Sequence, residues 1–187
     1  MMSVNDISFQ LSYLQSTVGL SPFNTAAFRY GIERNLLLAV ASRESHMGRL
    51  LDANYLGDHG NGMGIMQIDR RYHPEFAMQI HPGDHTANIQ KGAEILREEL
   101  NRFNGDVYAA LAAYNSGAGN VQRAIRYGLD PDYYTTGKDY AKDVLHRYEI
   151  INQLAEPTVA DVASIDAVKF ALLVSAAAGM AFYMYRN

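Results

Sequence analysis

Glu44 is the residue of this sequence whose position most clearly suggests chemistry. Leu37, Val40 and Glu44 are spaced at i, i+3 and i+7, so in a helix the carboxylate lies on the stripe of apolar residues that faces a core. Burial disfavours the charged form of a carboxylic acid, and a glutamic acid can then keep a proton near neutral pH and donate it to a leaving group. The helix alone leaves an alternative open, in which the carboxylate is satisfied by backbone groups or by Arg43.

Three more acids, Asp52, Asp58 and Asp69, follow Glu44 in a glycine-rich stretch. Inverting hydrolysis of a glycosidic bond needs a protonated acid on one side of the bond and a carboxylate that activates water on the other side. Acids on one helix and one loop can supply both groups. Each aspartate can equally cap a loop and have no catalytic role, and spacing alone does not separate these readings.

Helices are the elements expected to position these acids. The segment Leu56–Asp69 contains too many glycines for a helix and predicts a loop or a small hairpin, and Pro74 predicts a brief turn. Apolar periodicity and capping residues predict helices over Asn5–Thr17, from Ser21 as an N-cap, over Glu33–Met47, across Ile89–Phe103, from Asp106 as an N-cap to Tyr114, around Val121–Ile125 and over Lys138–Leu154.

Composition limits the function classes. A chain of 187 residues that is 48% hydrophobic can form one folded domain with a sizeable core. The net charge is −4 and the basic residues are scattered, so nucleic acid is not expected as a partner. The sequence has no cysteine, which excludes disulfides, thiolate metal sites and cysteine nucleophiles.

Two weaker patterns in the sequence resemble ligand sites. The glycines at 60, 62 and 64 are not followed by the Lys-Ser/Thr pair of a phosphate-binding loop. His81, Asp84 and His85 flank Pro82-Gly83, and a polar loop explains them better than a metal site does because a third imidazole is missing. We therefore expect no metal and no cofactor.

The carboxyl-terminal segment is strongly apolar. Residues 170–185 contain no charged side chain, and Lys169 is the one charged residue within 167–185. This length is close to the roughly 20 residues that cross a bilayer core, so we expect a single transmembrane helix over 167–186. A linker over 155–166 would join it to a domain over 1–154. A buried terminal core helix is the alternative, and small residues at every fourth position would permit self-association in a bilayer.

Three motifs carry a family resemblance. They are SRESHMG from Ser42, GDHGNGMGIMQID from Gly57 and AYNSGAGNV from Ala113. The motifs occur in the order found in goose-type lysozymes and the related soluble lytic transglycosylases, and the sequence strongly resembles these proteins across Ile32–Gln153. The resemblance implies a mainly α, α+β lysozyme-like fold with a small hairpin or loop beside the cleft.

The resemblance also implies roles for individual residues. Glu44 corresponds to the general acid, and Asp58 and Asp69 correspond to the aspartates that hold the attacking water. The implied substrate-binding residues are Met66, Gln67, His73, Tyr114, Asn115 and Tyr140.

We therefore expect a muramidase that cleaves the β-1,4 bond between N-acetylmuramic acid and N-acetylglucosamine in peptidoglycan. Two alternatives remain. The first is a lytic transglycosylase, in which the 6-hydroxyl of the sugar attacks and gives 1,6-anhydro products. The second is an inactive membrane-bound structural or glycan-binding protein with the same fold.

The expected location follows from the two termini. The first residues, MMSVNDISFQ, lack the basic and apolar regions of a signal peptide, whereas a wall-degrading domain has to reach peptidoglycan. We expect anchoring in a lipid bilayer, either the internal membrane of a phage virion, with virion proteins as neighbours, or the bacterial inner membrane facing the periplasm.

Overall fold

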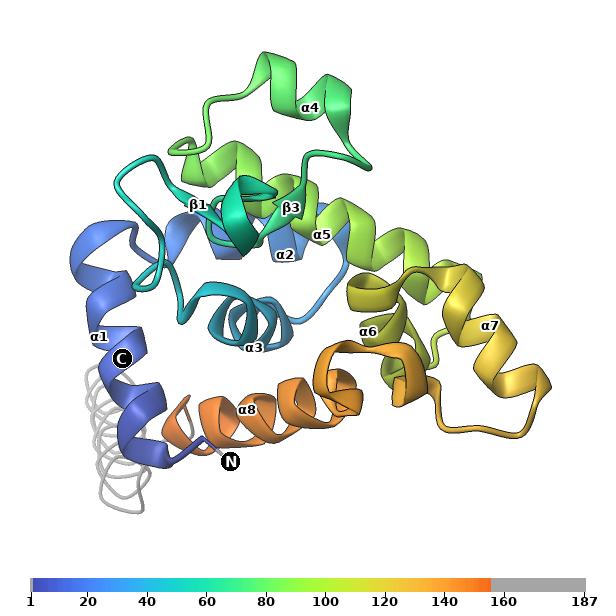
Figure 1. Ribbon diagram of the computed structural model, residues 1–187. Coiled ribbons are helices and arrows are strands. Elements are labelled where there is room, and N and C mark those ends of the chain that lie inside the picture. The colour runs from blue at the N-terminus through green and yellow to red at the C-terminus, as the bar shows by residue number, and fades with distance from the viewer. Residues whose placement is uncertain (1, 156–187) are drawn as a thin grey trace, which may run out of the picture. The chain divides into compact units, whose positions relative to one another are not determined.

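Helix α3 (Arg34–Ser45) runs through the middle of the helices and is buried on nearly every side (Figure 1). Seven consecutive residues, from Leu36 to Ser42, are buried. The spacing of Leu37, Val40 and Glu44 predicts one apolar stripe, but the residues from Leu36 to Ala41 are all apolar and cover every side of the helix, which suits the centre of a core. Because the middle of the helix is enclosed, its last turn places Glu44 half-buried at the edge of the core.

The computed structural model describes residues 2–155, and Met1–Leu154 form one compact unit. The other helices are α1 (Val4–Thr17), α2 (Ser21–Tyr30), α4 (Pro74–Gln79), α5 (His85–Arg102), α6 (Val107–Ser116), α7 (Ala118–Arg126) and α8 (Tyr140–Ala155). Single-turn 3-10 helices are η1 (Asp58–Gly60), η2 (Pro131–Tyr134) and η3 (Thr136–Lys138), and the strands are β1 (Leu56–Gly57), β2 (Gly62–Met63) and β3 (Ile68–Asp69).

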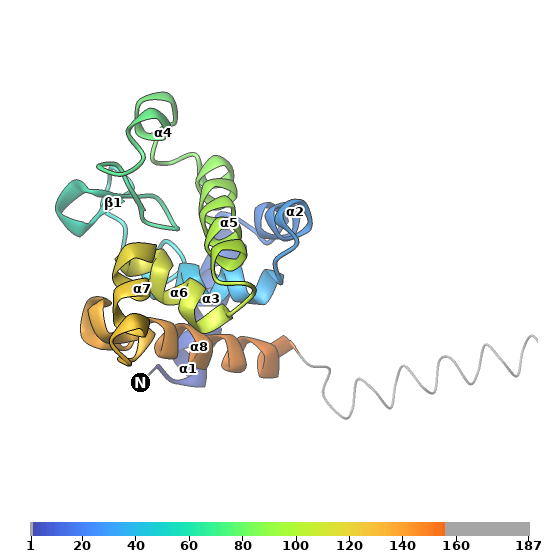
Figure 2. The same ribbon diagram turned by 90° about the vertical axis from the view of Figure 1, so that its right-hand side faces the viewer.

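The helices form layers around α3. Helix α5 packs against α2 and α6, and α6 packs against α7. Figures 1 and 2 agree that α4 and the strands lie at one end of this unit, that α1 and α8 lie at the other end, and that α3 lies between them. In α6 the five residues Ala109–Ala113 are all buried, and four of them are alanines, which let neighbouring helices approach closely.

The expected hairpin is present as a small antiparallel sheet with strand order β1-β2-β3. Leu56 pairs with Met63, and Met63 pairs with Ile68. Each strand has two residues, so the sheet gains little from its own ladder and depends on side chains from the helices.

Asn88 of α5 supplies that support. Its buried side chain donates to the carbonyl of Met63 and accepts from the backbone N–H of Met66, both at 2.8 Å. Gly64 lies between these residues with a φ of +64°, and a Cβ there would lie 2.5 Å from the Asn88 side chain. A glycine at position 64 is therefore required both by the backbone conformation and by the close approach of Asn88.

Two local expectations differ from the structure. Pro74 opens a helix of six residues, α4, rather than a turn, because proline suits the first position of a helix. Ser21 is the first residue of α2 and makes no capping hydrogen bond, since Leu20 occupies the N-cap position. Asp106 caps α6 as expected, because its side chain accepts from the N–H of Ala109.

The expected transmembrane helix requires a correction. Among residues 2–155, no helix is both long enough and apolar enough to cross a bilayer. The longest, α5, has 18 residues and is amphipathic, with charged side chains on its outer face. The part of the fold class that included a membrane helix, and the membrane localisation based on it, are therefore not supported. Residues 167–186 themselves, and most of the expected linker, lie outside the described part of the chain.

The expected lipid, self-association and virion partners depended on that helix and lose their support with it. The boundaries predicted for the domain and linker remain predictions.

Candidate active site

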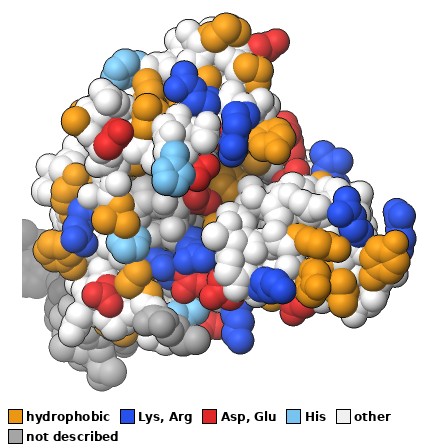
Figure 3. All heavy atoms as spheres, viewed as in Figure 1, with side chains coloured by type: hydrophobic (Ala, Val, Ile, Leu, Met, Phe, Trp, Pro, Cys, Tyr) orange, Lys and Arg blue, Asp and Glu red, His pale blue; other side chains and the backbone are white. Residues whose placement is uncertain are grey.

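A cleft of about 830 Å³ opens between the small sheet and the helices. Its walls come from the end of α3, from β2 and β3, from α5, from the end of α6 and from the turn that leads into α8. Figure 3 shows the hollow in the middle of one face, with acidic and basic side chains around it. The cleft therefore brings together segments that are more than 90 residues apart in the sequence.

Glu44 lies in this cleft on the last turn of α3 and is half-buried. The helix ends directly after it because His46 and Met47 adopt left-handed backbone conformations, with φ of 50° and 57°. Burial raises the pKa of the Glu44 carboxyl to about 7, although a hydrogen bond from Tyr140 and the charge of Arg43 act in the opposite direction. A substantial fraction of this carboxyl is thus protonated near neutral pH.

Two tyrosines, the buried Tyr140 and the half-buried Tyr114, accompany the acid. The hydroxyl of Tyr140 donates a hydrogen bond to Oε1 of Glu44, and the hydroxyl of Tyr114 donates to the carbonyl of Met66 at 2.9 Å. Burial and the nearby charge of Glu44 raise the pKa of both phenols well above their ordinary value. Both hydroxyls therefore stay protonated and remain hydrogen-bond donors.

Met66 and Gln67 occupy different environments. The Met66 side chain is fully buried and packs against Gly92 of α5, and Met66 is not among the residues that line the cleft. Gln67 lines the cleft, and its amide donates to the carbonyl of Gly64 at 2.8 Å. A Cβ at Gly57 or at Gly62 would overlap the Gln67 side chain, so the two glycines make room for it.

Asn115 and His73 line the cleft on different walls. The side-chain carbonyl of Asn115 accepts from the N–H of Thr136 at 2.9 Å, which joins the end of α6 to the turn before α8. His73 stands at the start of α4, where burial and the charge of Lys91 lower the pKa of its imidazole. His73 is therefore held in its neutral form.

Asp58 and Asp69 both lie in the cleft, near Arg71. Nε of Arg71 lies 3.0 and 3.1 Å from the two carboxylate oxygens of Asp69, and its Nη2 lies 3.5 Å from Oδ2 of Asp58. Hydrogen bonds from Arg71 lower the pKa of Asp69. Asp52 lies outside the cleft and accepts from the N–H groups of Asn54 and Leu56, so it caps a loop.

The sequence did not single out Arg71, nor an ion pair of α8 that contains a buried arginine. Arg147 of α8 is only 4% exposed, pairs with Asp143 at 2.7 Å and donates to Ser42 of α3. Arg43 lies 3.5 Å from the same carboxylate. The i, i+4 spacing of Asp143 and Arg147 is visible in the sequence, but their burial against α3 depends on the fold.

Glu99 of α5 is a further acid of the cleft that the sequence did not single out. Burial raises the pKa of its carboxyl, and Arg102 partly offsets this effect. Glu99 pairs with Arg102 at 3.1 Å and lines the cleft from α5.

Comparison with known proteins gives one family. A family model described as lysozyme g matches residues 20–153, which is more than half of the chain. The chain is 35% identical over 131 residues to lysozyme g of Gallus gallus, covering 65% of this chain and 58% of that protein. It is 35% identical over 135 residues to lysozyme g of Takifugu rubripes, covering 66% and 68%.

A bacterial relative is more distant. The membrane-bound lytic murein transglycosylase C of Haemophilus influenzae (strain PittEE) is 29% identical over 136 residues, which cover 64% of this chain and 37% of that protein. The chain spans about three fifths of the length of the bird relatives that it matches.

Proposed function

Because the chain belongs to the lysozyme g family, we propose that it is a muramidase that cleaves the β-1,4 bond between N-acetylmuramic acid and N-acetylglucosamine in peptidoglycan. The observation that carries the proposal is the state of Glu44. A half-buried carboxyl in an open cleft, with a pKa of about 7, is suited to give a proton to a glycosidic oxygen.

In the proposed reaction, Glu44 is the general acid. It protonates the oxygen of the leaving sugar as the glycosidic bond breaks, while positive charge develops on the ring of the other sugar. Tyr140 orients the carboxyl through its hydrogen bond, and the charge left on Glu44 after proton transfer is stabilised by that same bond.

Asp69, together with Asp58, is proposed to orient the water that attacks the anomeric carbon from the opposite face. The lowered pKa of Asp69 keeps this carboxylate ionised over the working pH range, as a water-orienting group requires. Attack by water on that face inverts the configuration of the anomeric carbon. No step of this scheme uses a metal or a cofactor.

The substrate contacts are proposed along the same cleft. Gln67, His73 and Asn115 present polar groups to it, and Tyr114 lies beside the acid. Met66 has its side chain in the core and would contribute by holding the Tyr114 hydroxyl with its carbonyl. We propose that these groups hold the sugars on either side of the scissile bond.

The activity is tested with Glu44→Gln in a turbidity assay on bacterial cell walls. The amide has the shape of the acid but cannot donate the required proton, so lysis should fall by at least about 100-fold while the fold is retained. The far-ultraviolet circular dichroism of the variant serves as the control for folding. Clearing of the walls at the wild-type rate would refute the role of Glu44.

A second candidate reaction is lytic transglycosylation, and one observation favours it. Arg71 occupies both carboxylate oxygens of Asp69, which leaves Asp69 less free to receive a proton from water. In that reaction the 6-hydroxyl of the N-acetylmuramic acid attacks the anomeric carbon of the same sugar. Mass spectrometry of the products separates the two reactions. Hydrolysis leaves a reducing end, whereas lytic transglycosylation leaves a 1,6-anhydro end that is lighter by one water.

A glycan-binding protein without turnover is the remaining alternative from the sequence. The same mass spectrometry addresses it, since a protein without turnover releases neither product from peptidoglycan.

A further inference from the structure

One surface next to the cleft has no role in the proposed reaction. Arg123 and Arg126 of α7, Tyr133 and Tyr134 of η2, and Lys138 of η3 form it, and we call it the basic aromatic patch. All five side chains are exposed. Figure 3 shows hydrophobic side chains gathered on this part of the molecule, with basic side chains around them, on the same face as the hollow.

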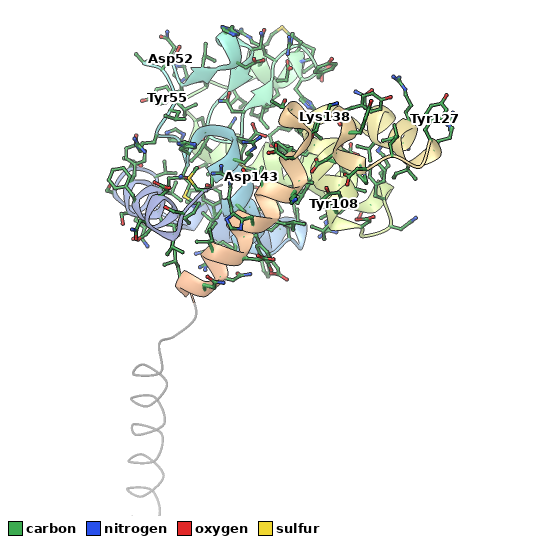
Figure 4. All side chains as sticks on the ribbon, turned by 60° about the horizontal axis from the view of Figure 1, so that its bottom comes forward. Asp52, Tyr55, Tyr108, Tyr127, Lys138 and Asp143 are labelled. Atoms are coloured by element: carbon green, nitrogen blue, oxygen red, sulfur yellow. The ribbon has the colours of Figure 1, made fainter. Side chains whose placement is uncertain are left out.

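Aromatic rings hold two of the cations in the patch. The ammonium of Lys138 lies 4.6 Å from the centre of the Tyr133 ring, and the guanidinium of Arg123 lies 5.6 Å from that of Tyr134. The two rings contact each other edge to face, with 4.9 Å between their centres. Lys138 extends from a turn in which it and Gly137 both have positive φ, and Figure 4 shows it just before α8. These contacts restrict two long side chains that would otherwise move freely.

Three carboxylates neighbour the patch in the sequence, and each of them is bound to a group outside the patch. Asp130 and Asp132 both accept hydrogen bonds from Tyr108, and Asp139 pairs with Arg43. Within residues 2–155, none of the three patch cations forms an ion pair with a carboxylate. The patch thus presents three cationic side chains that hold no carboxylate of the described residues, on a chain whose net charge is −4, and the carboxylates of a ligand would complement them.

The patch continues from a wall of the cleft. Thr136 lines the cleft and lies between Tyr134 and Lys138 in the sequence, and its N–H is held by Asn115. A peptidoglycan strand bound in the cleft carries a peptide stem on alternate sugars, and these stems end in carboxylates. Guanidinium and ammonium groups are suited to bind carboxylates.

We propose that the basic aromatic patch binds the carboxylates of peptide stems on a peptidoglycan strand that extends beyond the cleft. This proposal rests on the proposed function, because it takes the same polymer as the ligand of the cleft. The patch would add affinity for intact cell wall over the affinity that the cleft gives for the sugars alone.

The test measures binding without turnover, with the full chain in the Glu44→Gln background. Affinity is measured by sedimentation with purified sacculi that lack phosphate-containing wall polymers, at low salt. Arg123→Gln/Lys138→Gln should weaken binding by about five-fold, and added salt should reduce this difference. Arg123→Lys/Lys138→Arg should keep most of the affinity, because both charges remain.

A matched control is available elsewhere on the chain. Arg29 lies over the ring of Tyr30 and Arg49 over that of Phe9, and neither arginine lines the cleft. Arg29→Gln/Arg49→Gln removes the same charge from the same kind of contact, and should change the affinity by less than about two-fold.

Three results would overturn the proposal. The first is unchanged affinity of the Arg123→Gln/Lys138→Gln chain, and the second is an equal loss in the control. The third is an equal loss on glycan strands from which an amidase has removed the peptide stems, because the carboxylates of the stems are then absent and the one carboxylate that remains on each N-acetylmuramic acid belongs to the sugar itself. Cleavage by the wild-type chain is measured separately, so failure of the patch leaves the proposed function untouched, and failure of cleavage does not affect the binding result.

Discussion

The two sides of the cleft shift the pKa values of their carboxyl groups in opposite directions. On the helical side, Glu44 is half-buried beside Tyr140, and desolvation raises its pKa to about 7. On the sheet side, Asp69 is bound by Arg71 near the surface, and the pKa of Asp69 is lowered. Opposite environments within one cleft produce a proton donor and a stable anion from chemically similar side chains. The difference arises from burial on one side and from a paired charge on the other.

The largest expected effect tests whether the helical side depends on buried charge. Asp143→Asn removes the carboxylate that pairs with the buried guanidinium of Arg147, and should lower the free energy of unfolding by about 3 to 4 kcal/mol. Asp58→Asn removes the exposed pair with Arg71 and should cost less than about 0.5 kcal/mol. Urea denaturation measures both. Equal losses would remove the distinction between the two sides.

The next prediction concerns stability and pH at Glu44. Folding raises the pKa of this group from 4.5 to about 7, so its contribution to stability is complete below pH 4.5 and is lost as the pH rises to 7. Glu44→Gln removes the ionisation and should be more stable than wild type by about 3 kcal/mol at pH 8, with the difference vanishing near pH 4. Urea denaturation at the two pH values checks this, and a difference independent of pH would contradict it.

A smaller effect is expected for Tyr140→Phe. In the wild type, the hydrogen bond from Tyr140 lowers the pKa of Glu44. The substitution removes this bond, so the pKa of Glu44 should rise and the alkaline limb of the pH–activity profile should move to higher pH. The rate on the plateau should fall by about five-fold, because the acid loses the group that orients it. Movement of the alkaline limb to lower pH would show that Tyr140 acts in another way.

The smallest effect is expected for Arg71→Gln on the sheet side. Without the guanidinium the pKa of Asp69 should rise toward its ordinary value, so the acid limb of the pH–activity profile should move to higher pH. The melting temperature should not change measurably, since Arg71 is exposed. An Asp69→Asn background provides the control, because the acid limb due to this carboxylate is then absent and Arg71→Gln should not shift the pH profile of the residual activity.

Local patterns in the sequence predicted the helices and the small hairpin well, because periodicity and glycine content act over a few residues. They could not predict that α3 is enclosed on nearly every side, since this depends on which helices pack around it. The sequence-based assignment of a transmembrane helix used length and hydropathy alone, and the described helices do not support it.

In the candidate site, too, some features could be predicted from the sequence and others depend on the fold. Its residues were selected by motif, and the structure brings Glu44, Asp69, Tyr114 and Tyr140 to one cleft. Their catalytic and binding roles remain predictions. Arg71 was missed because nothing in the sequence indicates that its guanidinium turns back to Asp69. Met66 was selected because it lies within a motif, but its side chain belongs to the core.

The Asn88 side chain has a consequence for how the cleft moves. Its amide bonds join α5 to two backbone groups of the sheet segment, at Met63 and Met66. Opening the cleft at this wall would leave three buried polar groups without partners. The Met66 amide proton should therefore exchange with solvent as slowly as those in the centre of α3. A rigid wall of this kind would require the long polymer to adapt to the enzyme during each encounter.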